Sequence, residues 1–171
     1  MHFHFEVNGH LLFLVSLWPD MKLKPAYIYF FFSLWLSVLL HSQNQKADSL
    51  LKVYQSTTAD SNKVKALNEL FAVYRATDEE MAVKYVNMAV SFGAKTNFTN
   101  GYAYALYNKG QFEGRHANFD TSDHYINLAL IQYKKIDNKT GLAACNMAYG
   151  LNMYDKGNHK EALAFFLESL K

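Results

Sequence analysis

The strongest constraint in this sequence is a 40-residue repeat that begins near residue 61 and needs no gaps. Shifting the sequence by 40 superimposes small residues on small residues: Ala82 on Ser122 and Ala162, Gly101 on Gly141, and Gly110 on Gly150. A fixed period of this length is typical of stacked supersecondary units, each of which buries its apolar face against its neighbours. The period therefore predicts an array of similar units.

Each unit contains two stretches whose apolar residues recur at three- and four-residue steps, the spacing of one face of an α-helix. In the first unit these residues are Val64, Leu67, Leu70, Phe71 and Tyr74, followed by Ala82, Tyr85, Val86, Ala89 and Val90. The two prolines, Pro19 and Pro25, both precede the repeats, so no proline interrupts a helix there. Thr77 with Glu80, and Asn158 with Glu161, have the spacing of a capping box between the two helices. We therefore expect an all-α fold of paired helices.

The third unit carries a recognisable set of residues: Tyr149-Gly150, Met153-Tyr154, a Gly157-Asn158 turn, Ala162, Phe166 and Ser169. In this it resembles the tetratricopeptide repeat (TPR), which has a large residue, Leu-Gly and an aromatic in its first helix, then Ala and an aromatic in its second. The first unit departs from the pattern because Leu70 stands where the glycine belongs. The period also exceeds the usual 34 residues and resembles the longer variety of kinesin light chains and bacterial regulatory arrays. The resemblance implies a right-handed α-solenoid of antiparallel helix pairs with about three repeats, and a HEAT-like array stays open as an alternative.

These patterns divide the chain into six segments. They are a probable non-native upstream extension (1–20), a signal peptide (21–42), a leading helix and linker (43–60), and TPR-like repeats at 61–100, 101–140 and 141–171, the last truncated. The third repeat is expected to be truncated because its second helix ends some five residues short of the equivalent helix in the second repeat.

The signal peptide is predicted from the order of residues 21–42. Lys22 and Lys24 precede an apolar run from Ala26 to Leu40, and the small Ser42 follows it. As a helix the run would reach about 22 Å, which is less than the roughly 30 Å of a bilayer core. We therefore expect cleavage near Ser42 and export to the periplasm or the exterior, with a membrane anchor beyond the repeats as a further option. The alternative is a single anchor over residues 11–40, which would place three charged residues at mid-membrane.

Composition excludes several classes of function. The formal net charge of +2, from 17 basic and 15 acidic residues, gives no field that would gather nucleic acid or a membrane surface. Cys145 is the only cysteine, so no intrachain disulfide and no paired-thiolate metal site can form. His116, His124 and His159 lack the spacing of a helical metal site, and no glycine cluster could cradle a phosphate. We predict no catalysis, no metal and no cofactor.

The resemblance implies a partner-binding groove, because stacked helix pairs expose their first helices along a concave surface. Counting by register, the predicted lining is Asn68, Phe71 and Arg75, then Tyr107, Asn108, Gln111 and Arg115, then Met147, Leu151 and Tyr154. Arg75 and Arg115 are the only arginines and lie one period apart, and a guanidinium can hold a carboxylate through two hydrogen bonds. An acidic ligand is therefore one expectation. The other is that both arginines are solvated helix ends and both asparagines bond to neighbouring backbone.

These observations together predict an exported, non-catalytic module that binds a protein or peptide. A narrower form is the sensor-side part of an envelope signalling protein, which rests on analogy with similar exported arrays. The alternatives are a structural scaffold of an envelope or secretion assembly and an accessory module of an enzyme. On this register, Ala82→Trp or Ala162→Trp should unfold the array, whereas Lys109→Ala should not.

Overall fold

The computed structural model describes residues 29, 33, 34 and 45–171. The chain divides into two compact units, Met1–Ser42 and Gln43–Lys171. The predicted upstream extension and signal peptide lie outside the described residues, except that Tyr29, Ser33 and Leu34 are helical and exposed. No helix among the described residues is long and apolar enough to cross a membrane.

The described part of the second unit is helical throughout and contains no strand, so the all-α class is confirmed there. A leading helix covers residues 45–56, and it is followed by α3 (Asp60–Tyr74), α4 (Glu79–Gly93), α5 (Thr99–Arg115), α6 (Phe119–Lys135), α7 (Lys139–Asp155) and α8 (His159–Glu168). The helices α4, α6 and α8 begin 40 residues apart, as do α5 and α7. The sequence period is therefore a period of helices.

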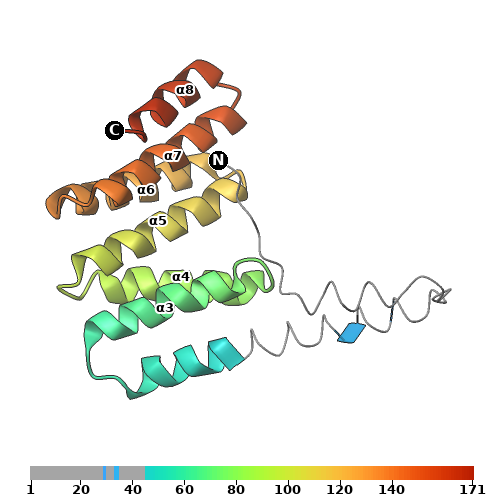
Figure 1. Ribbon diagram of the computed structural model, residues 1–171, viewed down its shortest axis with the longest axis vertical. Helices are drawn as coiled ribbons and strands as arrows, with labels where there is room; N and C mark the ends of the chain where they lie inside the picture. Colours follow the sequence, from blue (N-terminus) through green and yellow to red (C-terminus); the bar gives the residue numbers. More distant parts are fainter. Residues whose placement is uncertain (1–28, 30–32, 35–44) are drawn as a thin grey trace, which may run out of the picture. The chain divides into compact units, whose positions relative to one another are not determined.

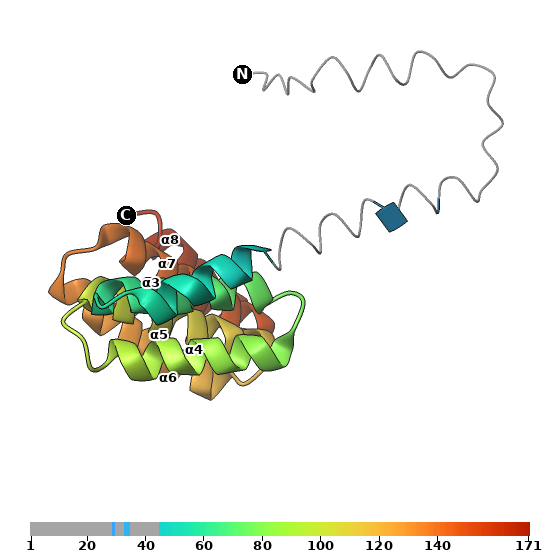
Figure 2. The same ribbon diagram turned by 90° about the horizontal axis from the view of Figure 1, so that it is seen from below.

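The helices form three successive pairs arranged in two layers (Figure 1). Each of α3, α5 and α7 packs against the helix that follows it in sequence. In addition α3 contacts α5 and α5 contacts α7, whereas α4 and α6 share no contact. Figure 2 shows α4 and α6 along one side of the stack and α3 along the other. The first helices of the pairs therefore form an inner layer in which successive helices touch, whereas α4 and α6 in the outer layer do not.

Small residues allow the two helices of each pair to approach closely. Ala82, Ser122 and Ala162 occupy equivalent positions in the second helices, and all three are buried. In the central pair the Ser122 hydroxyl donates a hydrogen bond of 2.8 Å to the Gly110 carbonyl oxygen. A Cβ atom at Gly110 would lie 2.7 Å from Ile126 Cγ1, so no larger residue fits there without a shift. The two helices of the central pair therefore approach closely at Gly110 and Ser122.

The helix starts differ from the predicted capping boxes. The N-cap of α4 is Asp78, whose Oδ1 accepts a hydrogen bond of 3.0 Å from the Met81 amide. Thr77 instead donates its hydroxyl back to the Val73 carbonyl oxygen at 3.5 Å. The reason is the turn after α3, in which the Tyr74 carbonyl accepts from the amides of both Thr77 and Asp78, so α4 starts one residue later. Asn158 is the N-cap of α8 but makes no capping hydrogen bond with its side chain.

The turns within the second and third pairs share a left-handed residue. Ala117 has φ of 59° and Gly157, one period later, has φ of 82°. In both turns the next amide closes the preceding helix, since Asn118 donates to the Glu113 carbonyl and Asn158 to the Met153 carbonyl. Glycine enters this region freely, whereas alanine does so at a cost.

The last pair differs in exposure from the central pair. Ala162 is buried, but Leu163, Leu167 and Leu170 are exposed on one face of α8 and the turn that follows it. Cys145 on α7 is fully buried in a cluster that includes Leu106 of α5. Burial raises the pKa of its thiol to about 12, so the thiol is protonated at neutral pH.

Candidate functional site

Two hollows lie along the junction of α5 and α7. We call the first the tyrosine hollow. It has a volume of about 220 Å³ and is lined by Asn100, Tyr104, Tyr107, Tyr133, Asn138, Thr140, Gly141 and Ala144. Its α5 wall is aromatic and its α7 wall is small, so the rings of α5 remain accessible beside a helix that packs against it. The exposed fraction of Tyr104 is 43%.

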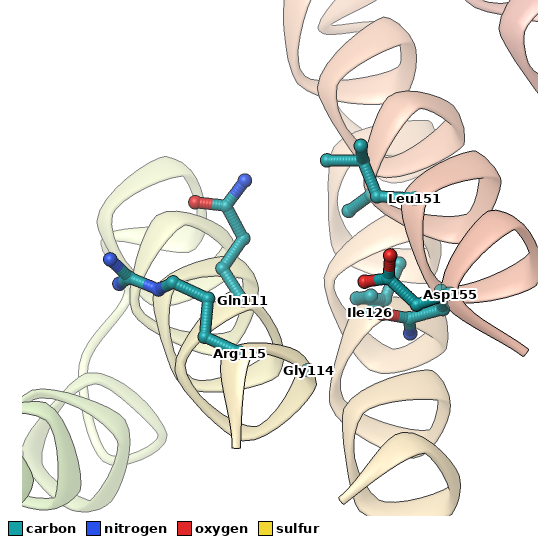
Figure 3. Close-up of a pocket in the computed structure, with 8 residues that line it drawn as sticks. Gln111, Gly114, Arg115, Ile126, Leu151 and Asp155 are labelled. Atoms are coloured by element: carbon teal, nitrogen blue, oxygen red, sulfur yellow. The ribbon is translucent and has the colours of Figure 1, made fainter. Parts of the chain in front are cut away.

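The second hollow, which we call the Arg115 hollow, continues along the same two helices. It has a volume of about 200 Å³ and is lined by Gln111, Gly114, Arg115, Ile126, Ala148, Leu151, Asn152 and Asp155. Figure 3 shows Leu151 and Asp155 on α7 directed toward α5, which carries Gln111 and Arg115 on the other side of the hollow. The guanidinium is directed away from the Asp155 carboxylate (Figure 3). The two hollows together form the groove between α5 and α7.

The tyrosine rings are ordered by contacts within the groove. Tyr104 and Tyr107 stack with ring centroids 6.3 Å apart and an interplanar angle of 22°. Gln111 Nε2 donates a hydrogen bond of 2.7 Å to the Tyr107 hydroxyl. Burial raises the pKa of Tyr107, which the hydrogen bond from Gln111 and the positive charge of Arg75 only partly offset, and burial also raises that of Tyr133. Both phenols are therefore protonated at neutral pH and can donate hydrogen bonds.

Two asparagines at the edge of the tyrosine hollow are bonded to each other. Asn138 Nδ2 donates to Asn100 Oδ1 at 2.8 Å. Asn138 Oδ1 in turn accepts from the Gly141 amide at 2.8 Å, which caps the start of α7. Both side-chain oxygens are therefore engaged within the protein.

Seven of the ten residues predicted to line the groove reach the surface. Arg75, Arg115, Met147, Leu151 and Tyr154 are exposed, whereas Tyr107 and Gln111 are partly buried. Tyr107, Gln111, Arg115 and Leu151 line the two hollows.

The other three predicted residues are buried, which corrects the predicted surface. Asn68, Phe71 and Asn108 have exposed fractions of 3%, 1% and 3%. Asn68 Nδ2 donates to the carbonyl oxygens of Val64 and Gly101, and its own Oδ1 accepts from Asn108 Nδ2 at 3.1 Å. These amides satisfy one another and the backbone between α3 and α5. One step along a helix turns the side chain by about 100°, so Tyr107 faces the groove and Asn108 the interior.

The two arginines are both exposed at the ends of inner-layer helices. Neither forms an ion pair with another residue in the described part of the chain. Arg115 shares its hollow with Asp155, whose opposite charge reduces the net positive field there. Joint action of Arg75 and Arg115 on an acidic ligand therefore stays a prediction.

Sequence reasoning missed several lining residues, namely Asn100, Tyr104, Tyr133, Asn138 and Asp155. A signal for two of them was present. Tyr104 precedes Tyr107 by three residues, and Asp155 lies one period after Arg115, so each shares a helix face with a predicted residue. Tyr133 comes from α6, and no register along the first helices could have found it.

Lys109, expected to be an exposed and neutral position, is buried. Its ammonium pairs with Glu113 Oε1 at 2.8 Å, and the two side chains are only 11% and 13% exposed. The ammonium also lies 5.8 Å from the Phe112 ring centroid and 6.0 Å from that of Tyr125. Burial by itself would raise the pKa of Glu113, but hydrogen bonds from Lys109 and Asn118 outweigh it and lower that pKa. Lys109 is thus a structural residue of the central pair.

No group of three or more histidine, cysteine or acidic residues that could hold a metal ion occurs in the described ranges. Comparison with protein-family models, with curated proteins and with solved structures gives no match for this chain. The geometry of the groove is therefore the feature from which a function can be inferred.

Proposed function

We propose that residues 43–171 form a TPR-like α-solenoid that binds a peptide segment of another protein in the groove between α5 and α7. The 40-residue spacing of helix starts and the contacts within the inner layer support the solenoid. Right-handed stacking of about three pairs is part of this proposal and follows the resemblance to the TPR pattern.

The observation that carries the proposal is that the groove stays open between two helices that are in contact with each other. The tyrosine hollow and the Arg115 hollow lie in a row between them, with volumes of about 220 and 200 Å³. Aromatic and aliphatic side chains line this groove beside a small number of polar groups, which is the usual composition of a recognition site.

We propose no catalytic role for the groove. Cys145, the one thiol of the chain, is buried, and its pKa of about 12 makes it a poor nucleophile. Asp155 is the only carboxylate that lines the two hollows, so neither holds a pair of acids. Export, and a sensor-side role in signalling, are proposals that depend on residues 21–42. N-terminal sequencing of secreted protein should find residues up to about Ser42 removed.

The binding proposal is tested by selecting ligands from a random peptide display library with the full chain. Leu151→Asp should weaken the selected peptides at least about tenfold, because it places an unpaired charge against the buried part of the ligand. Ile131→Asp on α6 is the matched control, since Ile131 and Leu151 have similar exposed fractions of 41% and 47%. Equal losses for the two variants, or no selected peptide at all, would refute the proposed groove.

A structural role in an assembly is the second candidate, and the exposed leucines of the last pair favour it. Leu163, Leu167 and Leu170 form an apolar surface of the kind that associates with other proteins. Analytical ultracentrifugation should then show assembly that Leu167→Glu abolishes. A monomer at all concentrations would remove this candidate and leave the groove proposal intact.

A further inference from the structure

We propose that the tyrosine hollow selects an extended, proline-rich segment of the partner. This inference rests on the proposed function, because it specifies the ligand of the same groove. It follows from the hydrogen-bonding state of the polar atoms at the hollow, some of which have partners among the described residues while others do not.

The Tyr107 hydroxyl has a hydrogen to donate into the groove. It accepts the hydrogen bond from Gln111 at 2.7 Å, so its own hydrogen points to another acceptor. No described residue accepts it. The raised pKa of Tyr107 keeps that hydrogen in place at neutral pH. Tyr104 presents a second phenol beside it, stacked on the same face of α5.

The amide oxygens at the same edge each accept one hydrogen bond within the protein already, which leaves each at most one lone pair. Asn100 Oδ1 is bonded to Asn138 Nδ2, and Asn138 Oδ1 is bonded to the Gly141 amide. Asn100 Nδ2 keeps its hydrogens, since it donates to no other described residue. The hydrogens of the Tyr107 hydroxyl and of Asn100 Nδ2 are therefore available to a ligand, while each asparagine oxygen already accepts one hydrogen bond.

A proline-rich segment matches this imbalance. Proline has a carbonyl acceptor but no N–H, and the polyproline II helix leaves every carbonyl free of internal hydrogen bonds. Its rings also pack flat against aromatic side chains, as in other aromatic-lined grooves that bind such segments. A helical ligand would use its carbonyls internally, and an extended ligand without proline would bring amides that need acceptors.

The dimensions suit a short segment. Tyr104 and Arg115 are 11 residues apart on α5, so at 1.5 Å per residue they are separated by about 16 Å along the groove. A polyproline II helix rises about 3.1 Å per residue, which makes this length about five residues. The ligand would then place proline against the tyrosines and a polar residue near Arg115 and Asp155.

The test compares two labelled peptides by fluorescence anisotropy with the full chain. One consists of repeated Pro-Pro-Leu units, and the other of Ala-Ala-Leu units of the same total length. The proline peptide should bind more tightly. Tyr107→Phe should weaken it about fivefold, the effect of one lost hydrogen bond, and Tyr104→Ala by about tenfold through loss of the stacked ring.

Tyr74→Phe is the matched control, because Tyr74 stacks on Tyr85 and lines neither hollow. It should leave the affinity unchanged. Equal affinity for the two peptides, or an unchanged affinity in Tyr107→Phe, would overturn the inference. If a displayed peptide without proline binds and is lost in Leu151→Asp while the proline peptide fails to bind, this inference is wrong and the proposed function stands. If no peptide of either kind binds, both are wrong.

Discussion

The junction between the first and second helix pairs has an aromatic ring at a position where the junction between the second and third pairs has a hydrogen-bonded amide. At the first junction Phe71 of α3 meets Phe112 of α5 edge to face, with ring centroids 6.3 Å apart. At the second junction Asn152 of α7, one period after Phe112, donates to Ser122 Oγ at 2.8 Å and to Asp123 Oδ1 at 2.7 Å. Two residues at equivalent positions of the repeat, Phe112 and Asn152, are therefore apolar at one junction and polar at the other.

The charges at the two junctions also have different partners. Lys156 pairs with Asp123 Oδ2 at 2.9 Å and lies over the Phe119 ring at the second junction. The equivalent His116 instead places Nε2 3.2 Å from Glu79 Oε1, and its ring contacts that of Phe112 at a tilt of 37°. All buried side-chain polar atoms among the described residues have hydrogen-bond partners. The period therefore specifies the helices, whereas the side chains that meet at each junction differ. Both junctions combine apolar packing with hydrogen-bonded polar groups, which are Asn68 and Asn108 at the first and Asn152, Ser122 and Asp123 at the second.

The largest expected effect on stability comes from removing the aromatic ring at the first junction, and it can be compared with removal of the equivalent amide at the second. Phe112→Ala should lower the free energy of unfolding by about 3 to 5 kcal/mol, because it empties a buried aromatic site. Asn152→Ala should cost only about 1 to 3 kcal/mol, since Lys156 still pairs with Asp123. Urea denaturation of both variants measures the difference. Equal costs would mean that the two junctions are energetically alike.

Overpacking should destabilise the first and third pairs through the small residues between their two helices. Ala82→Trp should destabilise by about 3 kcal/mol and Ala162→Trp by less, because Ala82 belongs to a cluster that also includes Phe112 of α5, whereas the neighbours of Ala162 along α8 are more exposed. Thermal melts followed by circular dichroism would show the order. A variant at Ala82 that melts like the unmodified chain would show that the close contact does not constrain the pair.

The central pair contributes a buried charge pair that should cost about 2 kcal/mol to break. Lys109→Ala leaves Glu113 without its ammonium partner, contrary to the neutral effect expected from sequence. Because the pKa of Glu113 is lowered on folding, its stabilisation is present above its ordinary value of 4.5 and is lost as the pH falls through the lower, folded value. The free energy of unfolding should therefore fall less steeply with decreasing pH in Lys109→Ala than in the unmodified chain. If the decrease of the free energy of unfolding at acid pH is the same in the variant, the destabilisation comes from lost packing alone.

Converting the second junction into the first should reveal coupling of about 1 to 2 kcal/mol. Asn152→Phe alone should destabilise, since it removes two hydrogen bonds from Asp123 and Ser122. Adding Asp123→Val, the residue found one period earlier, should recover part of the loss because an apolar replacement removes a half-buried carboxylate that has lost its hydrogen bond from Asn152. Strict additivity in the double-mutant cycle would mean that the two positions act independently.

The smallest effects should come from the turns, where backbone rather than side chains differs. Ala117→Gly should stabilise by about 1 kcal/mol, and Gly157→Ala should destabilise by a similar amount, because both residues are left-handed. Differential scanning calorimetry can resolve the opposite signs. Shifts of the same sign would indicate that one turn changes its conformation in the variant.

The sequence predicted the helices well because the period is a property of the backbone. It predicted the exposure of side chains less well, because residues at the same position of the repeat differ in burial from one repeat to the next. Leu67 is buried, Tyr107 partly buried and Met147 exposed, although they lie one period apart. Residues at equivalent positions of the repeat can therefore be covered by different numbers of neighbouring side chains, which the sequence position alone does not indicate. The tyrosine hollow also needed Tyr133 from an outer helix, and only the packing of α6 on α7 brings it there.

The single buried thiol offers a direct reading of how often the second junction opens. Cys145 lies inside the cluster between α5, α6 and α7, so an alkylating reagent can reach it only when α7 separates from its neighbours. No other cysteine competes for the label, and the modification rate therefore reports the frequency of that one opening event. A peptide seated across α5 and α7 must be released before α7 can move away. Slower alkylation in the presence of a ligand would then report groove occupancy without any knowledge of the natural partner.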